Sequence, residues 1–157
     1  MASTWKIISG GQTGVDRAAL DLARTLGLAY GGFVPKGRRT EDGPLPDDYA
    51  GMIELDSPNY AARTIRNLLE ADATLILTRG AADGGTLLTL EMAQAKGRPV
   101  LVVDLADEES DVVPRIRAWL GAMPTGTLNI AGPRESRKPG IRADAQALLI
   151  KVFENWN

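Results

Sequence analysis

Glycines, a hydroxyl group and charged side chains are concentrated in the segment Ser9–Arg17, which reads SGGQTGVDR. It follows a short apolar stretch and leads into a run with helical spacing. At such a turn, glycines let the backbone approach a ligand closely, and the free N–H groups of the first helical turn favour an anion. The segment therefore predicts an oxyanion site, with the candidate ligand-binding residues Gly10, Gly11, Gln12, Thr13, Gly14 and Arg17.

The same turn departs from the common phosphate-binding patterns. It matches neither Gly-x-Gly-x-x-Gly nor the Walker A pattern with its Lys-Ser/Thr, so a standard dinucleotide or ATPase site is not supported. Thr13 is predicted to cap the following helix, and Asp16, three residues later, is predicted to reach back as in a capping box. The adjacent glycines together with Gly14 still exceed what one turn needs.

Two later segments offer related chemistry. In Asp83–Thr86, a pair of glycines precedes a predicted helix, with Thr86 as its cap. In Gly132–Lys138, Arg134 can neutralise an oxyanion, and Ser136 can donate its hydroxyl. The candidate ligand-binding residues of these segments are Gly84, Gly85, Thr86, Gly132, Arg134 and Ser136.

A long loop, Pro35–Asp48, supplies further cations. Its candidate ligand-binding residues are Lys36, Arg38 and Arg39, which can reach a ligand from a mobile segment. Loops of this length in compact domains are often functional. A solvated insertion explains the same residues equally well, so both interpretations stay open.

Strand and helix patterns alternate along the chain. Strands are predicted over Lys6–Ser9, Tyr30–Val34, Met52–Leu55, Ala73–Thr78, Pro99–Leu105 and Thr127–Ala131. Helices are predicted over Val15–Leu26, Tyr60–Glu70, Thr86–Lys96, Asp111–Met123 and Ile141–Asn155. On the second of these helices, we expect Arg63 on an exposed face and Asn67 bonded to a loop.

Continuously apolar strands are buried on both faces, which is typical of a parallel sheet covered by helices. The sequence therefore predicts one Rossmann-like α/β domain over residues 1–157, with a mostly parallel sheet flanked by helices on both faces. Ligands bind at the carboxyl ends of the strands in such sheets. The segments that follow the strands are thus expected to meet at one edge.

Composition excludes several kinds of chemistry. The chain has 157 residues, of which 44% are hydrophobic, a formal net charge of -2, and no cysteine or histidine. It therefore lacks thiol catalysis, histidine acid–base chemistry and the usual side-chain ligands of zinc or iron. The charge disfavours general nucleic-acid binding. With no signal pattern and no membrane-length apolar run, a cytoplasmic protein is expected.

Together these segments resemble the family known as putative molybdenum carrier proteins. The matching blocks span nearly the whole chain: Ser9–Asp21, Pro35–Arg39 with Glu41–Gly43, Tyr60, Arg63–Thr64 with Asn67, Asp72–Ile76, Gly84–Thr86 with Thr89, and Leu128–Ser136. The resemblance implies a circularly permuted branch of the nucleotide-binding SLOG/lysine-decarboxylase-like superfamily. It implies a small anionic ligand, which is molybdate, the molybdenum cofactor or a nucleotide. It also makes a homodimer plausible.

The resemblance leaves an enzymatic alternative. Phosphoribohydrolases of the superfamily carry Pro-Gly-Gly-x-Gly-Thr-x-x-Glu, and a nucleotide N-glycosidase here would need a catalytic acid. The corresponding run Asp83–Glu91 lacks the proline and the third glycine, and Glu91 does not lie three residues after Thr86 or Thr89. The candidate acids are Asp16, Glu41 and Glu91. A sensor or assembly module, whose ligand only changes partner binding, is the third hypothesis.

Overall fold

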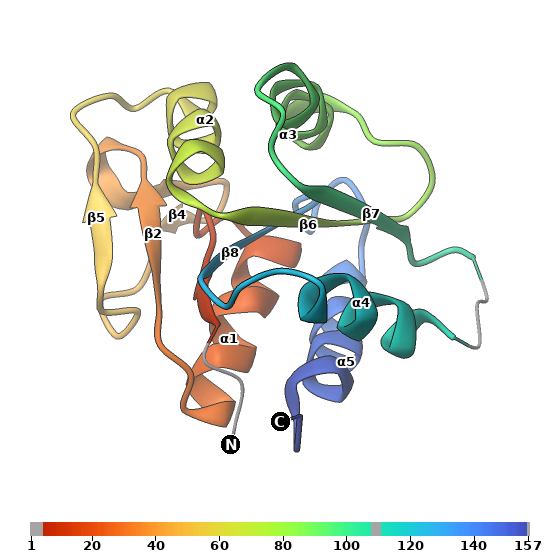
Figure 1. Cartoon of the computed structure of the whole chain (residues 1–157). Coiled ribbons are helices and arrows are strands. Elements are labelled where there is room, and N and C mark those ends of the chain that lie inside the picture. The colour runs from red at the N-terminus through yellow and green to blue at the C-terminus, as the bar shows by residue number, and fades with distance from the viewer. Residues whose placement is uncertain (1–4, 108–110, 157) are drawn as a thin grey trace.

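Six parallel strands form the central sheet of the computed structural model, which describes residues 5–107 and 111–156. Their spatial order is β5-β2-β1-β8-β6-β7, with neighbouring strands hydrogen-bonded to each other (Figure 1). The strands are β1 (Lys6–Ile8), β2 (Tyr30–Val34), β5 (Met52–Glu54), β6 (Ala73–Thr78), β7 (Val100–Asp104) and β8 (Thr127–Ala131). The predicted parallel sheet is thereby confirmed.

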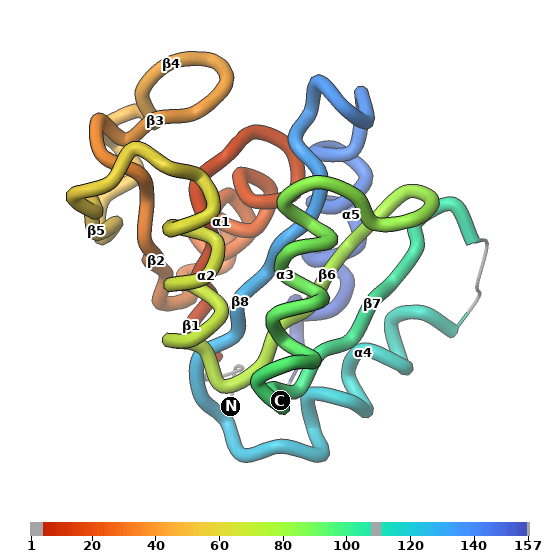
Figure 2. Tube along the Cα trace, turned by 90° about the horizontal axis from the view of Figure 1, so that it is seen from above, coloured from red at the N-terminus to blue at the C-terminus, as the bar shows by residue number. Residues whose placement is uncertain are grey.

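Helices cover both faces of this sheet (Figures 1 and 2). They are α1 (Val15–Leu26), α2 (Tyr60–Glu70), α3 (Gly84–Ala95), α4 (Val112–Gly121) and α5 (Ile141–Phe153). Helices α1 and α4 contact α5 on one face, whereas α2 and α3 contact each other on the opposite face. The molecule is therefore a Rossmann-like α/β fold, as the alternation of patterns predicts. None of the described helices is both long enough and apolar enough to cross a membrane.

Strand side chains give the two faces different characters. Leu75 and Leu77 of β6 and Leu128 and Ile130 of β8 are fully buried in the main hydrophobic core, which also contains residues of α1, α4 and α5. Because successive side chains of a strand point to opposite faces, the residues between them face α2 and α3. Asn129 is one of these, and it is 2% exposed. The face under α2 and α3 is therefore the more polar one.

The helix ends differ from the predicted capping. Gly14, which has no side chain to donate or accept, occupies the N-cap of α1 with φ 77°, so the predicted Thr13 cap is wrong. A Cβ on residue 14 would lie 2.2 Å from the carbonyl oxygen of Pro133. Backbone packing therefore requires glycine there. Helix α3 begins at Gly84, ahead of the predicted Thr86 cap, whereas the Asn59 side chain caps α2 by accepting from Ala61 N.

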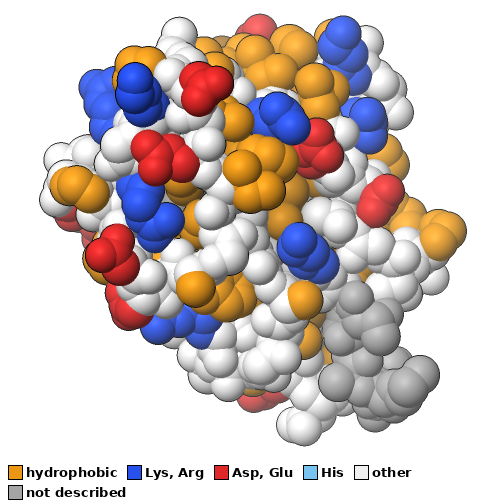
Figure 3. All heavy atoms as spheres, turned by 90° about the vertical axis from the view of Figure 1, so that its left-hand side faces the viewer, with side chains coloured by type: hydrophobic (Ala, Val, Ile, Leu, Met, Phe, Trp, Pro, Cys, Tyr) orange, Lys and Arg blue, Asp and Glu red, His pale blue; other side chains and the backbone are white. Residues whose placement is uncertain are grey.

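The loop predicted over Pro35–Asp48 has local order of its own. It contains a short 3-10 turn, Lys36–Arg38, followed by a hairpin of β3 (Arg39–Thr40) and β4 (Gly43–Pro44). Figure 2 shows this hairpin at the upper left, beyond the end of β2. Figure 3 faces the β5 edge, where Lys and Arg side chains are interspersed with Asp and Glu.

Candidate functional site

A cavity of about 160 Å³ lies at the carboxyl-terminal edge of β1 and β8, and α2 and α3 form two of its walls. In Figure 2 the same two helices run side by side over the central strands. The chain leaves β1 toward β2 and leaves β6 toward β7 on the opposite side, and open α/β sheets bind ligands where the strand order reverses in this way. The lining residues are Gly10, Gln12, Asp16, Arg63, Thr64, Asn67, Asp83, Gly84, Gly85, Thr86, Thr89, Asn129, Ala131, Gly132, Pro133, Arg134 and Arg137.

Three of the predicted segments meet at this cavity. They are the turn after β1, the turn before α3 and the loop after β8. Among the described residues predicted to bind a ligand, those that line the cavity are Gly10, Gln12, Gly84, Gly85, Thr86, Gly132 and Arg134. The parallel sheet brings these segments together because each follows a strand at the same edge.

Asp16 and Arg63 form a buried charged pair in the cavity wall. Arg63 Nη1 lies 3.8 Å from Asp16 Oδ2 and donates a hydrogen bond of 2.6 Å to the Gly10 carbonyl oxygen. Burial raises the pKa of Asp16 to about 6, although Arg63 and the N–H group of Gln12 act to lower it. The prediction of an exposed Arg63 is wrong, since this residue is only 6% exposed.

Arg134 contributes a positive charge that no carboxylate neutralises directly. Its guanidinium lies 5.2 Å from the centre of the Tyr60 ring, and among residues 5–107 and 111–156 it makes no hydrogen bond or ion pair. By contrast, Arg137 pairs with Asp83 at 3.2 Å. Arg39 and Arg63 also face the Tyr60 ring, at 4.4 Å and 5.3 Å. Three guanidinium groups therefore surround this ring.

Gln12 lies in the turn after β1 and is 5% exposed. Its Oε1 accepts hydrogen bonds from the backbone N–H groups of Thr13 (3.0 Å) and Glu41 (2.9 Å). Its Nε2 is buried without a hydrogen-bond partner among the described residues. Buried polar atoms in native proteins nearly always have a partner. Because Gln12 lines the cavity, a ligand bound there is a candidate partner for this donor.

Glu41 bridges the hairpin to two other segments of the site. Its carboxylate accepts from Thr13 Oγ1 at 2.6 Å and from Ser136 Oγ at 2.5 Å, and it also accepts from Ser136 N at 3.2 Å. Burial alone raises the pKa of Glu41, but the hydrogen bonds from Ser136 and Thr13 hold it below its usual value. The hydroxyls of Thr13 and Ser136, predicted to hold a ligand, thus bond to Glu41 and lie outside the cavity lining.

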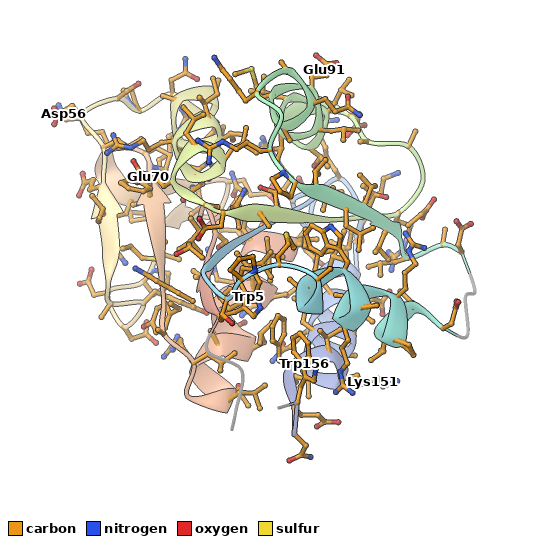
Figure 4. All side chains as sticks on the ribbon, viewed as in Figure 1. Trp5, Asp56, Glu70, Glu91, Lys151 and Trp156 are labelled. Atoms are coloured by element: carbon orange, nitrogen blue, oxygen red, sulfur yellow. The ribbon has the colours of Figure 1, made fainter. Side chains whose placement is uncertain are left out.

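The remaining predicted residues also lie outside the lining. Arg17 donates to the Gly11 carbonyl oxygen at 3.2 Å, and Gly14 caps α1. Arg38 donates to backbone carbonyls of Leu45, Pro46 and Tyr49, and Arg39 donates to that of Pro58. Lys36 is exposed in the 3-10 turn. Glu91 lies on the exposed side of α3, directed away from the sheet (Figure 4).

Sequence reasoning missed several polar residues of the wall. Asn67 accepts from Phe33 N at 2.9 Å and donates to Phe33 O at 3.0 Å, so it bonds to strand β2 and not to a loop as predicted. Thr89 donates to Gly85 O and occupies the position three residues after Thr86, where the phosphoribohydrolase pattern has its glutamate. One signal in the sequence could have indicated Asn129, because it is a polar residue between two large apolar residues of its strand.

Comparison with known proteins identifies relatives of the whole chain. Residues 7–153 match the model of the circularly permutated YpsA SLOG family. A crystal structure of a putative molybdenum carrier protein from Syntrophus aciditrophicus SB is 44% identical in sequence. The match covers 98% of this chain and 96% of that chain, with a TM-score of 0.91. No curated protein matches.

Proposed function

Because the chain belongs to the circularly permutated YpsA SLOG family, we propose that it binds a small anionic ligand in the cavity between α2 and α3. The ligand is an oxyanion, either free, as in molybdate, or carried by a nucleotide derivative or by the molybdenum cofactor. Molybdenum is the metal named for the similar protein from Syntrophus aciditrophicus SB. Backbone N–H groups, amides and guanidinium groups suit all of these ligands, because none of them requires a thiol or an imidazole.

The single observation that carries this proposal is the unpaired Arg134 guanidinium in the cavity wall. A partly buried guanidinium that has no hydrogen bond or ion pair among the described residues is costly, and Arg63 adds a second positive charge nearby. An anion in the cavity would give Arg134 a direct partner and would also be attracted by Arg63, which already pairs with Asp16. The first turn of α3, with Gly84 and Gly85, lines the same cavity and supplies further N–H donors.

Binding can be tested by isothermal titration with molybdate, sulfate, inorganic phosphate and adenosine 5′-monophosphate. We expect at least one of these anions to bind, and Arg134→Ala to weaken that binding on the order of tenfold or more. Arg66→Ala is the matched control, because Arg66 lies on α2 but is exposed and paired with Glu70 outside the cavity. Failure of all four anions to bind the wild-type protein would refute the proposal.

A second candidate function, nucleotide N-glycosidase, is favoured by Asp16 alone. Of the three candidate acids, only Asp16 lines the cavity. Its pKa of about 6 suits proton transfer near neutral pH. This function predicts release of adenine from adenosine 5′-monophosphate, measured by liquid chromatography, and its loss in Asp16→Asn. Absence of free adenine after prolonged incubation with the wild-type protein would leave only the binding function.

A further inference from the structure

The orientation of the Gln12 side-chain amide is fixed by its own hydrogen bonds. Two backbone N–H groups, of Thr13 and Glu41, both donate to one oxygen, Oε1. Turning the amide over would place its NH₂ group against these two donors, and a donor cannot satisfy a donor. Nε2 is therefore the atom left for any other partner.

Nothing in the described part of the protein supplies that partner. Gln12 is only 5% exposed, yet it lines the cavity. Leaving a buried amide donor unsatisfied is unfavourable. The two hydrogen bonds to Oε1 nevertheless keep the Gln12 amide in this orientation. A ligand atom in the cavity that accepts a hydrogen bond would supply the missing partner of Nε2.

We propose that Gln12 determines ligand specificity in this cavity by donating, through Nε2, a hydrogen bond to an unprotonated oxygen of the bound oxyanion. The proposal rests on the anion-binding function above. It adds that Gln12 contacts one particular group of the ligand, an oxygen that carries no proton. Glu41 acts as a positioning residue, because its backbone N–H holds Oε1 and its carboxylate ties the hairpin to Thr13 and Ser136. A ligand that presents an N–H or O–H donor at this point is disfavoured.

A substitution that preserves shape tests the role of Nε2. Gln12→Glu keeps an oxygen to accept from Thr13 N and Glu41 N, but replaces the donor by a second acceptor. We expect binding of molybdate, or of adenosine 5′-monophosphate, to weaken about tenfold to a hundredfold, on the order expected for a hydrogen bond to a charged group. Gln94→Glu is the matched control, because Gln94 is exposed on α3 and the charge change is the same. It should bind within about twofold of wild type, given that exposed charges interact weakly.

Added negative charge alone could weaken anion binding, so a direct readout is needed. The side-chain NH₂ signals of Gln12 can be observed by ¹⁵N–¹H NMR and assigned by their absence in Gln12→Glu. On titration with each of the two probes, one of the two protons should move downfield in proportion to occupancy. Molybdate and adenosine 5′-monophosphate are titrated separately, so the response distinguishes a free oxyanion from a phosphate ester.

The outcomes separate this inference from the proposed function. If a probe binds while the Gln12 signals stay in place and Gln12→Glu binds within about threefold of wild type, the specificity role is overturned and the binding function stands. If neither probe binds the wild-type protein, the specificity role is overturned; the binding function is overturned with it only if sulfate and inorganic phosphate also fail to bind. A downfield shift together with weakened binding in Gln12→Glu, but not in Gln94→Glu, supports the inference.

Discussion

Asp16 and Arg63 are within 3.8 Å of each other, with side chains 10% and 7% exposed. Burial outweighs the attraction of the pair and leaves the pKa of Asp16 at about 6, above its ordinary 3.8. A carboxyl group whose folded-state pKa is raised contributes stability that is fully present below its unfolded pKa. That contribution is lost as the pH rises through the folded pKa.

The first prediction concerns the pH dependence of stability. Between about pH 4 and pH 7.5, the wild-type protein should lose about 2–3 kcal/mol of unfolding free energy relative to Asp16→Asn, which has no proton to release. Asp16→Asn leaves Arg63 without a counter-ion at every pH, so this pair gives the variant no pH dependence of its own. Urea unfolding of both proteins at several pH values measures the difference. A constant difference across this range would contradict the prediction.

Gly10 provides the second prediction, because the Arg63 side chain crosses directly over it. A Cβ at position 10 would lie 2.4 Å from Arg63 Cδ and 2.6 Å from its Nη1. Gly10→Ala must therefore displace a buried arginine from both Asp16 and the Gly10 carbonyl. We expect a loss of about 1–3 kcal/mol in unfolding free energy, in the range found for overpacking.

Gly85→Ala is the control for this substitution. Gly85 also lines the cavity, but an added Cβ there meets no heavy atom within 4 Å. Its unfolding free energy should stay within about 0.5 kcal/mol of wild type. Equal losses in the two variants, measured by urea unfolding, would show that contact with Arg63 does not make alanine costly at position 10.

The fold followed from local signals in the sequence. The helix Val15–Leu26 has glycines at both ends, and Gly27 closes it with φ 70°. The strand Ala73–Thr78 has the bounds predicted from its apolar run. Because parallel strands end at one edge, the meeting of the turns after β1, β6 and β8 could also be predicted.

The composition of the cavity wall could not be predicted in the same way. Arg63 is polar and lies on an amphipathic helix, so its local pattern indicates exposure. Its contacts with Gly10, 53 residues away, and with Asp16 explain its burial. Glu41 likewise reaches Ser136 across 95 residues. Contacts at such separations depend on how helices and hairpins pack, and no periodicity in one sequence records them. The orientation of the Gln12 amide also depends on such a contact, because the backbone N–H of Glu41 donates to its Oε1. This orientation leaves Nε2 without a partner among the described residues.

Asn67 gives the third prediction. Its side chain pairs with both backbone polar groups of Phe33 in β2, and its Nδ2 also donates to the Arg63 carbonyl. Asn67→Ala removes these three hydrogen bonds, two of them to buried backbone groups of β2, so we expect a loss of about 2–4 kcal/mol in unfolding free energy. Gln94→Ala removes an exposed amide on α3 and should change it by no more than about 0.5 kcal/mol. A neutral Asn67→Ala in thermal or urea unfolding would contradict this role.

The last prediction concerns the hairpin and its attachment to the site. Glu41→Ala removes the acceptor for Thr13 Oγ1 and Ser136 Oγ, which join the hairpin to the turns after β1 and β8. Amide hydrogen exchange at Thr40 and Glu41 should then accelerate, and Gln12 should lose the backbone donor that fixes its amide. Because the Gln12 amide is then no longer held in place, the affinity for the anion should also fall. Asp42→Ala is the matched control, since Asp42 carries the same charge on the same hairpin but is exposed. If both variants leave exchange and affinity unchanged, the Glu41 carboxylate does not hold the hairpin. If only Glu41→Ala changes both, the position of the hairpin and the orientation of the Gln12 donor are coupled.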